Sequence, residues 1–96
     1  MFLDKYLDEY YLEQVYSNYN LNYLQSLDEE NFNKIYKVFQ KYGFYFIEDI
    51  IENYIHLFTI DTKLLESGIL KLKEKLGDNF VYIIGDDLSF LDEIEK

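Results

Sequence analysis

The segment Phe44–Asp61 carries the most restrictive pattern in this chain. On a helical wheel its large apolar side chains fall on one side, while its acids, Asn53 and His56 fill the opposite side. A helix with so wide an apolar stripe is stable in water only when other helices cover the stripe. The sequence therefore predicts an all-α domain in which this segment is the central helix.

The length and the apolar content set the size of the fold. A chain of 96 residues can build one hydrophobic core, and 49% hydrophobic residues are enough for it to fold despite its charge. We expect one compact domain of four to six short amphipathic helices. It divides into an acidic helix and turn over residues 1–27, a helix pair over residues 28–58 and a second pair over residues 62–95.

Capping residues predict where the first helices begin and end. A helix runs from Phe2 to about Ser17, with acids on its outer side and an apolar face of Leu3, Tyr6, Leu7, Tyr10 and Tyr11. A turn rich in asparagine follows it. Ser26 or Asp28 caps the next helix. Gly43 ends that helix as the residue in the left-handed conformation.

The second half of the chain carries similar signals. Asp61 or Thr62 caps a helix that Gly77 closes. This helix contains Gly68, which costs roughly 1 kcal/mol relative to alanine, and a close helix crossing would explain it. The apolar run 79–84 has no partner strand and predicts a short buried helix. Asp86 or Asp87 caps a last helix.

An internal similarity links the two predicted helix pairs. The segment Lys34–Gly43 aligns with Gly68–Gly77 at a shift of 34 residues. Such a period is typical of stacked helical hairpins, and the pattern is similar to mitochondrial-termination-factor-like and other α-solenoid helix pairs. The chain lacks the prolines and the basic surface of those factors, so no function is taken from this resemblance.

Composition removes several functional classes. Nineteen acids face nine lysines with no arginine, which gives a net charge of −10 and argues against nucleic acid or an anionic membrane as a direct partner. The absence of cysteine excludes disulfides and cysteine-based metal sites. The acidic N-terminal segment does not fit a signal peptide and no run is long enough for a membrane span, so a cytoplasmic location is expected.

No motif identifies a reaction. Glu52 and His56 stand four residues apart on one helix face, but the second histidine of a typical helical metal site is missing. The serines lack the flanking pattern of a nucleophile elbow, and the four glycines are isolated rather than gathered in a phosphate-binding loop. We therefore expect a protein without enzymatic activity, metal or cofactor.

The acids concentrate at the two ends of the chain. Residues 1–30 carry seven acids and one lysine, residues 31–77 carry six acids and seven lysines, and residues 78–96 carry six acids and one lysine. Because the termini of compact domains often lie close together, we expect the first and last helices, including Glu95, to form one negative surface. The predicted partner-binding residues are Asp4, Asp8, Glu9, Tyr10, Tyr11, Glu13, Tyr16, Asp86, Asp87, Asp92 and Glu93.

This surface suggests a function. We expect a binding protein whose acidic, tyrosine-bearing helices occupy a basic, nucleic-acid-binding surface of a partner protein. Small phage-encoded inhibitors of defence nucleases, including anti-CRISPR proteins, are similar in size and charge. The alternatives are an immunity protein or antitoxin for a basic nuclease toxin, a self-associating helical scaffold that forms homo-oligomers, and a domain whose charge only keeps it in solution.

Overall fold

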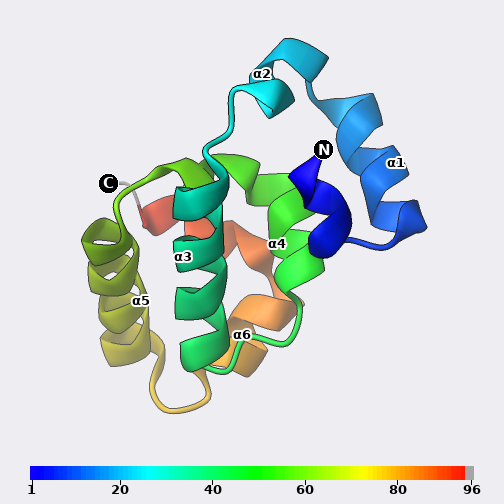
Figure 1. Cartoon of the computed structure of the whole chain (residues 1–96). Coiled ribbons are helices and arrows are strands. Elements are labelled where there is room, and N and C mark those ends of the chain that lie inside the picture. The colour runs from blue at the N-terminus through cyan, green and yellow to red at the C-terminus, as the bar shows by residue number, and fades with distance from the viewer. Residues whose placement is uncertain (95–96) are drawn as a thin grey trace.

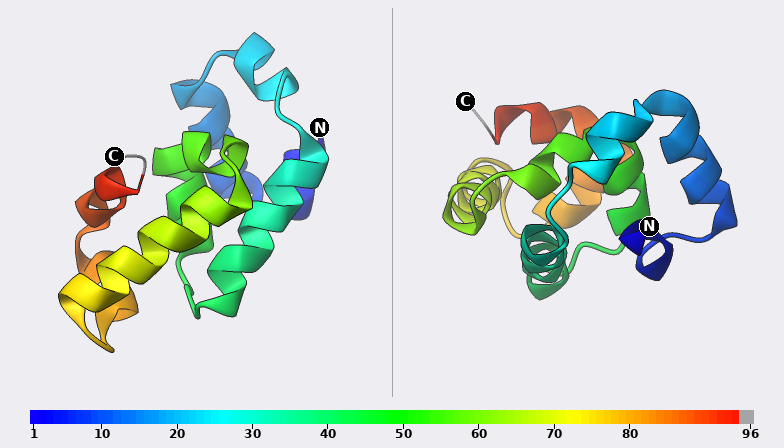
Figure 2. Two further views of the ribbon diagram at one scale, coloured as in Figure 1. Left: turned by 90° about the vertical axis from the view of Figure 1, so that its left-hand side faces the viewer. Right: turned by 45° about the horizontal axis from the view of Figure 1, so that its top comes forward.

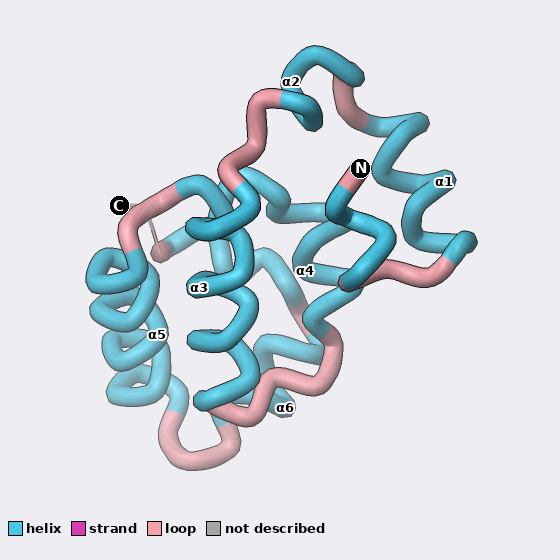
Figure 3. The backbone as a smooth tube through the Cα atoms, in the orientation of Figure 1, coloured by secondary structure: helices cyan, strands magenta, loops and turns pink. Residues whose placement is uncertain are grey.

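The chain folds into helices alone over the part that the structure describes. The computed structural model describes residues 1–94, and within this range it contains α-helices and 3₁₀ helices but no strand (Figures 1 and 3). The predicted all-α fold is therefore confirmed. In chain order the elements are η1 (Phe2–Lys5), α1 (Glu9–Asn18), α2 (Leu21–Gln25), α3 (Glu29–Lys41), α4 (Ile47–Tyr54), η2 (Ile55–Thr59), α5 (Thr62–Leu76), α6 (Phe80–Asp86) and η3 (Leu88–Glu93).

The helices form two layers around one core, and the Cα trace measures 37 × 24 × 21 Å. Helices α3 and α5 lie side by side in one layer, in front in the left view of Figure 2. The other layer contains α4 and α6, and α1 packs on the outer side of α4. The chain therefore has one face built from α3 and α5 and an opposite face built from α1 and α4.

The predicted central segment does form the middle of the core. Ile50 and Ile51 are fully buried, and the ring of Phe58 stacks on that of Phe32 with 4.5 Å between their centroids. The prediction of one continuous helix over Phe44–Asp61 is wrong, however. The α-helix begins only at Ile47, and the chain changes to the 3₁₀ helix η2 after Tyr54, whose φ of −137° is not helical.

The late start of α4 follows from the way in which α3 ends. Gly43 has a φ of +84°, and the amide of Phe44 donates to the carbonyl oxygen of Phe39 at 3.1 Å. The Phe44 ring then packs edge-on against the Phe39 ring, with 5.2 Å between centroids. This is a Schellman motif with its apolar contact, and it commits Phe44 to the end of α3 rather than to α4.

The prediction of a single helix from Phe2 to Ser17 is also wrong, because the segment forms two elements, η1 and α1. The Asp8 side chain accepts a 3.1 Å hydrogen bond from the Tyr11 amide and so begins a new helix, α1, after the short η1. An aspartate in this extended conformation stabilises a helix more as its N-terminal cap than as an interior residue. As a consequence Tyr10 points outward, with 62% of its surface exposed, instead of lying on the predicted apolar face.

Other predicted boundaries agree with the structure. Asp28, rather than Ser26, caps α3 by accepting from the Glu30 amide at 3.0 Å, and the run 79–84 lies largely within the helix α6. Both predicted units contain a long helix, a glycine with positive φ, a short helix and a 3₁₀ helix. The two units therefore share an element order, while the internal sequence repeat itself stays a prediction.

Candidate protein-binding surface

Two tyrosine hydroxyls attach α1 to α4. The Tyr11 hydroxyl donates to Oδ1 of Asp49 at 2.9 Å, and the Tyr19 hydroxyl donates to the backbone oxygen of Glu52 at 2.8 Å. The hydrogen bond to Asp49, burial and the nearby charges of Asp49, Glu48 and Glu52 together raise the pKa of Tyr11 to about 12. The acids of α4 therefore lie beside α1.

The predicted binding residues at the N-terminal end take different positions. Asp4, Glu9 and Glu13 are exposed, as are Tyr10 and Tyr16. Two further predicted residues already have structural roles. Asp8 is exposed but caps α1, and Tyr11 is half-buried, with its hydroxyl bonded to Asp49.

The four described acids predicted at the other end are exposed, and all of them except Asp86 have an interaction partner. Asp87 caps η3 by accepting from the amide and the hydroxyl of Ser89, and these bonds lower the pKa of its carboxyl group. Glu93 forms an ion pair with Lys75 of α5 at 3.0 Å. Asp86 and Asp92 are also exposed, whereas Glu95 lies outside the described residues.

The two acidic ends do not meet directly. Helices α1 and η3 lie on opposite sides of α4 (Figures 1 and 2). Helix α4 bridges them, because its Asp49 binds Tyr11 of α1 and its last residue, Tyr54, binds Asp92 of η3. Burial and this hydrogen bond to Asp92 raise the pKa of Tyr54 to about 12. The acids of the three elements therefore follow one another across the molecule.

We call this surface the acidic face. It comprises the carboxylates of α1, α4 and η3 that have no lysine partner among the described residues: Glu9, Glu13, Glu48, Asp49, Glu52 and Asp92.

The lysines lie elsewhere. Within residues 1–94 every lysine except Lys5 belongs to α3 or α5, so α1, α4 and η3 contain none. Several of these lysines bind acids of their own layer, as Lys34 does with Glu30 and Lys41 with Glu66, both at 3.5 Å. The lysines are thus confined to η1, α3 and α5, where they partly balance nearby acids, and the acidic face has no lysine of its own.

Sequence reasoning missed the three acids of α4. Glu48, Asp49 and Glu52 belong to the middle third of the chain, where acids and lysines balance in number. They were placed on the outer side of the central helix, but nothing in that pattern told which helix lies next to them. A signal did exist, because residues at such a spacing share one helix face that no lysine interrupts.

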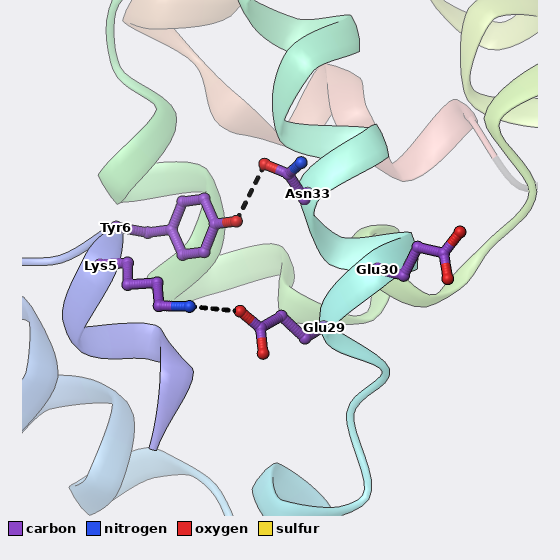
Figure 4. Close-up of a pocket in the computed structure, with 5 residues that line it drawn as sticks. All are labelled: Lys5, Tyr6, Glu29, Glu30 and Asn33. Atoms are coloured by element: carbon purple, nitrogen blue, oxygen red, sulfur yellow. Dashed lines mark hydrogen bonds and ion pairs between the residues drawn. The ribbon is translucent and has the colours of Figure 1, made fainter.

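Among the described residues no group of three histidine, aspartate or glutamate side chains is placed to hold a metal ion. The surface depression in Figure 4 is open to solvent, and four of its five lining side chains bond one another. There Lys5 pairs with Glu29 at 2.6 Å, and the Tyr6 hydroxyl donates to Asn33 at 3.0 Å.

Comparisons with known proteins add no assignment. No family model matches the sequence, and neither a curated protein nor a solved structure matches it. Among the described residues no helix combines the length and the apolar character needed to cross a membrane.

Proposed function

We propose that this chain is a non-enzymatic binding protein whose acidic face occupies a basic surface of a partner protein. The observation that carries the proposal is the separation of charge, with the lysines of residues 1–94 on η1, α3 and α5 and the acidic face free of them. Such a surface attracts a basic partner over a distance and orients it before contact.

The exposed tyrosines of α1 support the same role. Tyr10 exposes 62% of its surface and Tyr16 exposes 43%, and both lie on the helix that carries Glu9 and Glu13. Tyrosine is enriched at protein interfaces because its ring adds contact area and its hydroxyl adds a hydrogen bond. Helix α1 therefore combines long-range attraction with groups suited to short-range contact.

A nucleic-acid-binding protein is the partner that this surface suits best. Such proteins carry clustered lysine and arginine in the groove that holds the phosphates, and a rigid row of carboxylates can occupy that groove. An inhibitor of a defence nuclease, of the phage-encoded anti-CRISPR kind, would act in this way. An immunity protein for a nuclease toxin would use the same chemistry.

Charge reversal on two different faces tests the proposal. Glu9→Lys with Glu13→Lys reverses two charges of the acidic face. Glu30→Lys with Glu74→Lys changes the net charge of the chain by the same amount, but on α3 and α5. Asp8 is left intact because it caps α1. Binding to a panel of purified basic nucleases would be measured by calorimetry at two salt concentrations, with duplex DNA as competitor.

We expect the first variant to weaken a salt-sensitive complex about tenfold or more, and the second to change it little, because only the first removes carboxylates from the interface. Duplex DNA should displace the chain from its partner. Equal losses in the two variants would mean that net charge alone drives binding, and the proposed face would then be wrong.

A further inference from the structure

Two exposed tyrosine rings lie together away from α1. Tyr45 precedes α4 and Tyr82 lies on α6, and their ring centroids are 5.9 Å apart at an interplanar angle of 50°. They expose 65% and 66% of their surfaces, more than any other large hydrophobic side chain among the described residues. Neither hydroxyl forms a hydrogen bond within residues 1–94, in contrast to those of Tyr6 and Tyr11.

A glycine lets the aromatic side chains approach α6 closely. A Cβ atom at Gly85 would lie 3.0 Å from Cε1 of Phe46 and 3.2 Å from the Tyr45 hydroxyl. Glycine in a helix costs about 1 kcal/mol relative to alanine. The bare backbone at Gly85 therefore lets Tyr45 and Phe46 lie against α6, with the Tyr45 ring next to that of Tyr82.

The surroundings of the pair are acidic. Asp86 follows Tyr82 by four residues on α6, so the two side chains share one helix face, and Asp86 is exposed without an ion pair among the described residues. Neither α4 nor α6 contains a lysine. A cation that entered this surface would meet two exposed aromatic rings and a carboxylate on the helix of Tyr82, with no lysine on α4 or α6 to repel it.

We propose that Tyr45, Tyr82 and Asp86 form a binding site for an arginine side chain of a partner protein. A guanidinium group is planar, stacks on aromatic rings and bonds a carboxylate at its edge, which matches the three groups present. The inference rests on the proposed function, since it takes the partner to be basic. A second copy of this chain cannot supply the group, because the sequence contains no arginine and a net charge of −10 opposes self-association.

A short peptide tests the site directly. The acetylated and amidated peptide Gly-Arg-Gly would be titrated into the ¹⁵N-labelled chain, with the same peptide carrying uncharged citrulline as the control. The amide signals of Gly85 and Asp86 report on the site. The variants are Tyr82→Leu and, as a control, Tyr23→Leu, which changes an exposed tyrosine of α2 outside both proposed surfaces.

We expect the arginine peptide to shift both amide signals, and citrulline to shift them far less. Tyr82→Leu should weaken binding of the arginine peptide about two- to fivefold, the size of an exposed cation–π contact, while Tyr23→Leu leaves the titration unchanged. Equal shifts with arginine and citrulline, or an unchanged titration in Tyr82→Leu, would overturn the proposal.

The same titration separates this site from the proposed function. The variant Glu9→Lys with Glu13→Lys should retain the shifts at Gly85, because neither acid belongs to the arginine site. If the peptide leaves Gly85 unaffected while that variant loses a basic partner, the arginine site is wrong and the acidic face stands. If the peptide binds but the variant keeps full affinity for the partner, the acidic face is wrong and the arginine site stands.

Discussion

The hydroxyl of Tyr11 donates a hydrogen bond of 2.9 Å to the carboxylate of Asp49, a residue 38 positions later in the sequence. This contact brings a carboxylate of the central helix α4 to the acidic helix α1. It also gives an acid of the proposed binding face a fixed position, since a carboxylate that accepts a hydrogen bond keeps fewer rotamers than a free one.

Replacement of Tyr11 by phenylalanine isolates this hydrogen bond. The ring and its packing remain, so we expect the free energy of unfolding to fall by about 1 kcal/mol, the typical value of one hydrogen bond. Urea unfolding measures the change as a lower midpoint with the same slope. Tyr10→Phe is the control, because that hydroxyl has no hydrogen bond among the described residues. Equal midpoints for the two variants would show that the bond does not hold α1 in solution.

The raised pKa of Tyr54 should make the stability of the fold depend on pH in the alkaline range. Burial and its hydrogen bond to Asp92 raise its pKa from 10.0 to about 12, so the folded state favours the neutral hydroxyl. This stabilisation is complete below pH 10 and is lost as the pH rises toward 12. The stability difference between the wild type and Tyr54→Phe should therefore be constant up to about pH 10 and shrink above it.

Lysines also titrate in this range, so the measurement needs a reference. Tyr10→Phe leaves the buried hydroxyls in place and shares every lysine with Tyr54→Phe. Its pH profile is subtracted from that of Tyr54→Phe, so that the contribution of Tyr54 remains. A difference for Tyr54→Phe that grows with pH would contradict the direction of the pKa shift.

Replacement of Gly43 should lower stability through backbone conformation alone. Its φ of +84° is unfavourable for a side chain, yet a Cβ there would have no heavy atom within 4 Å. Gly43→Ala should therefore lower the free energy of unfolding by about 1–2 kcal/mol, through backbone strain alone. Gly43→Asn should lose less stability, because asparagine tolerates the left-handed region of backbone conformation. Thermal unfolding of the two variants makes the comparison, and an alanine variant as stable as the asparagine one would refute the assignment.

Features set by neighbours in sequence could be predicted. Gly43 and Gly77 were expected to end helices and both have positive φ, and Asp28 and Asp61 begin α3 and α5 as capping residues. These signals act over three or four residues, so the sequence contains all of the information. The wrong boundary at Asp8 is instructive, because helical periodicity continued through it while its local capping bond divided the segment.

The candidate surface could be predicted only in part. The exposure of Glu9 and Glu13 follows from their place on the polar side of a helix. The position of Asp49 beside α1, and the pairing of Glu93 with Lys75, depend on how distant helices pack. Periodicity gives the face of each helix but not the helix that covers it, and that choice is made by the fit of core side chains.

Gly68 gives the sharpest test of the packing between α5 and the end of the described chain. A Cβ at this position would lie 2.8 Å from Cγ2 of Ile94 and 3.1 Å from its Cα, which confirms the close crossing expected from the sequence. Gly68→Ala should therefore destabilise the fold by about 1–3 kcal/mol, as overpacking does, although alanine favours a helix. Ser67→Ala, at the exposed neighbouring position, should change stability by less than about 0.5 kcal/mol.

A double-mutant cycle then assigns the cause. Ile94→Leu keeps the apolar volume but removes Cγ2, so the penalty of Gly68→Ala should be smaller in that background. The relief should be partial, because the Cα of Ile94 stays close. Each free energy would come from urea unfolding. Strictly additive effects of the two substitutions would mean that the clash is relieved by movement of the backbone, and that α5 and Ile94 are less firmly packed than the contact distances indicate.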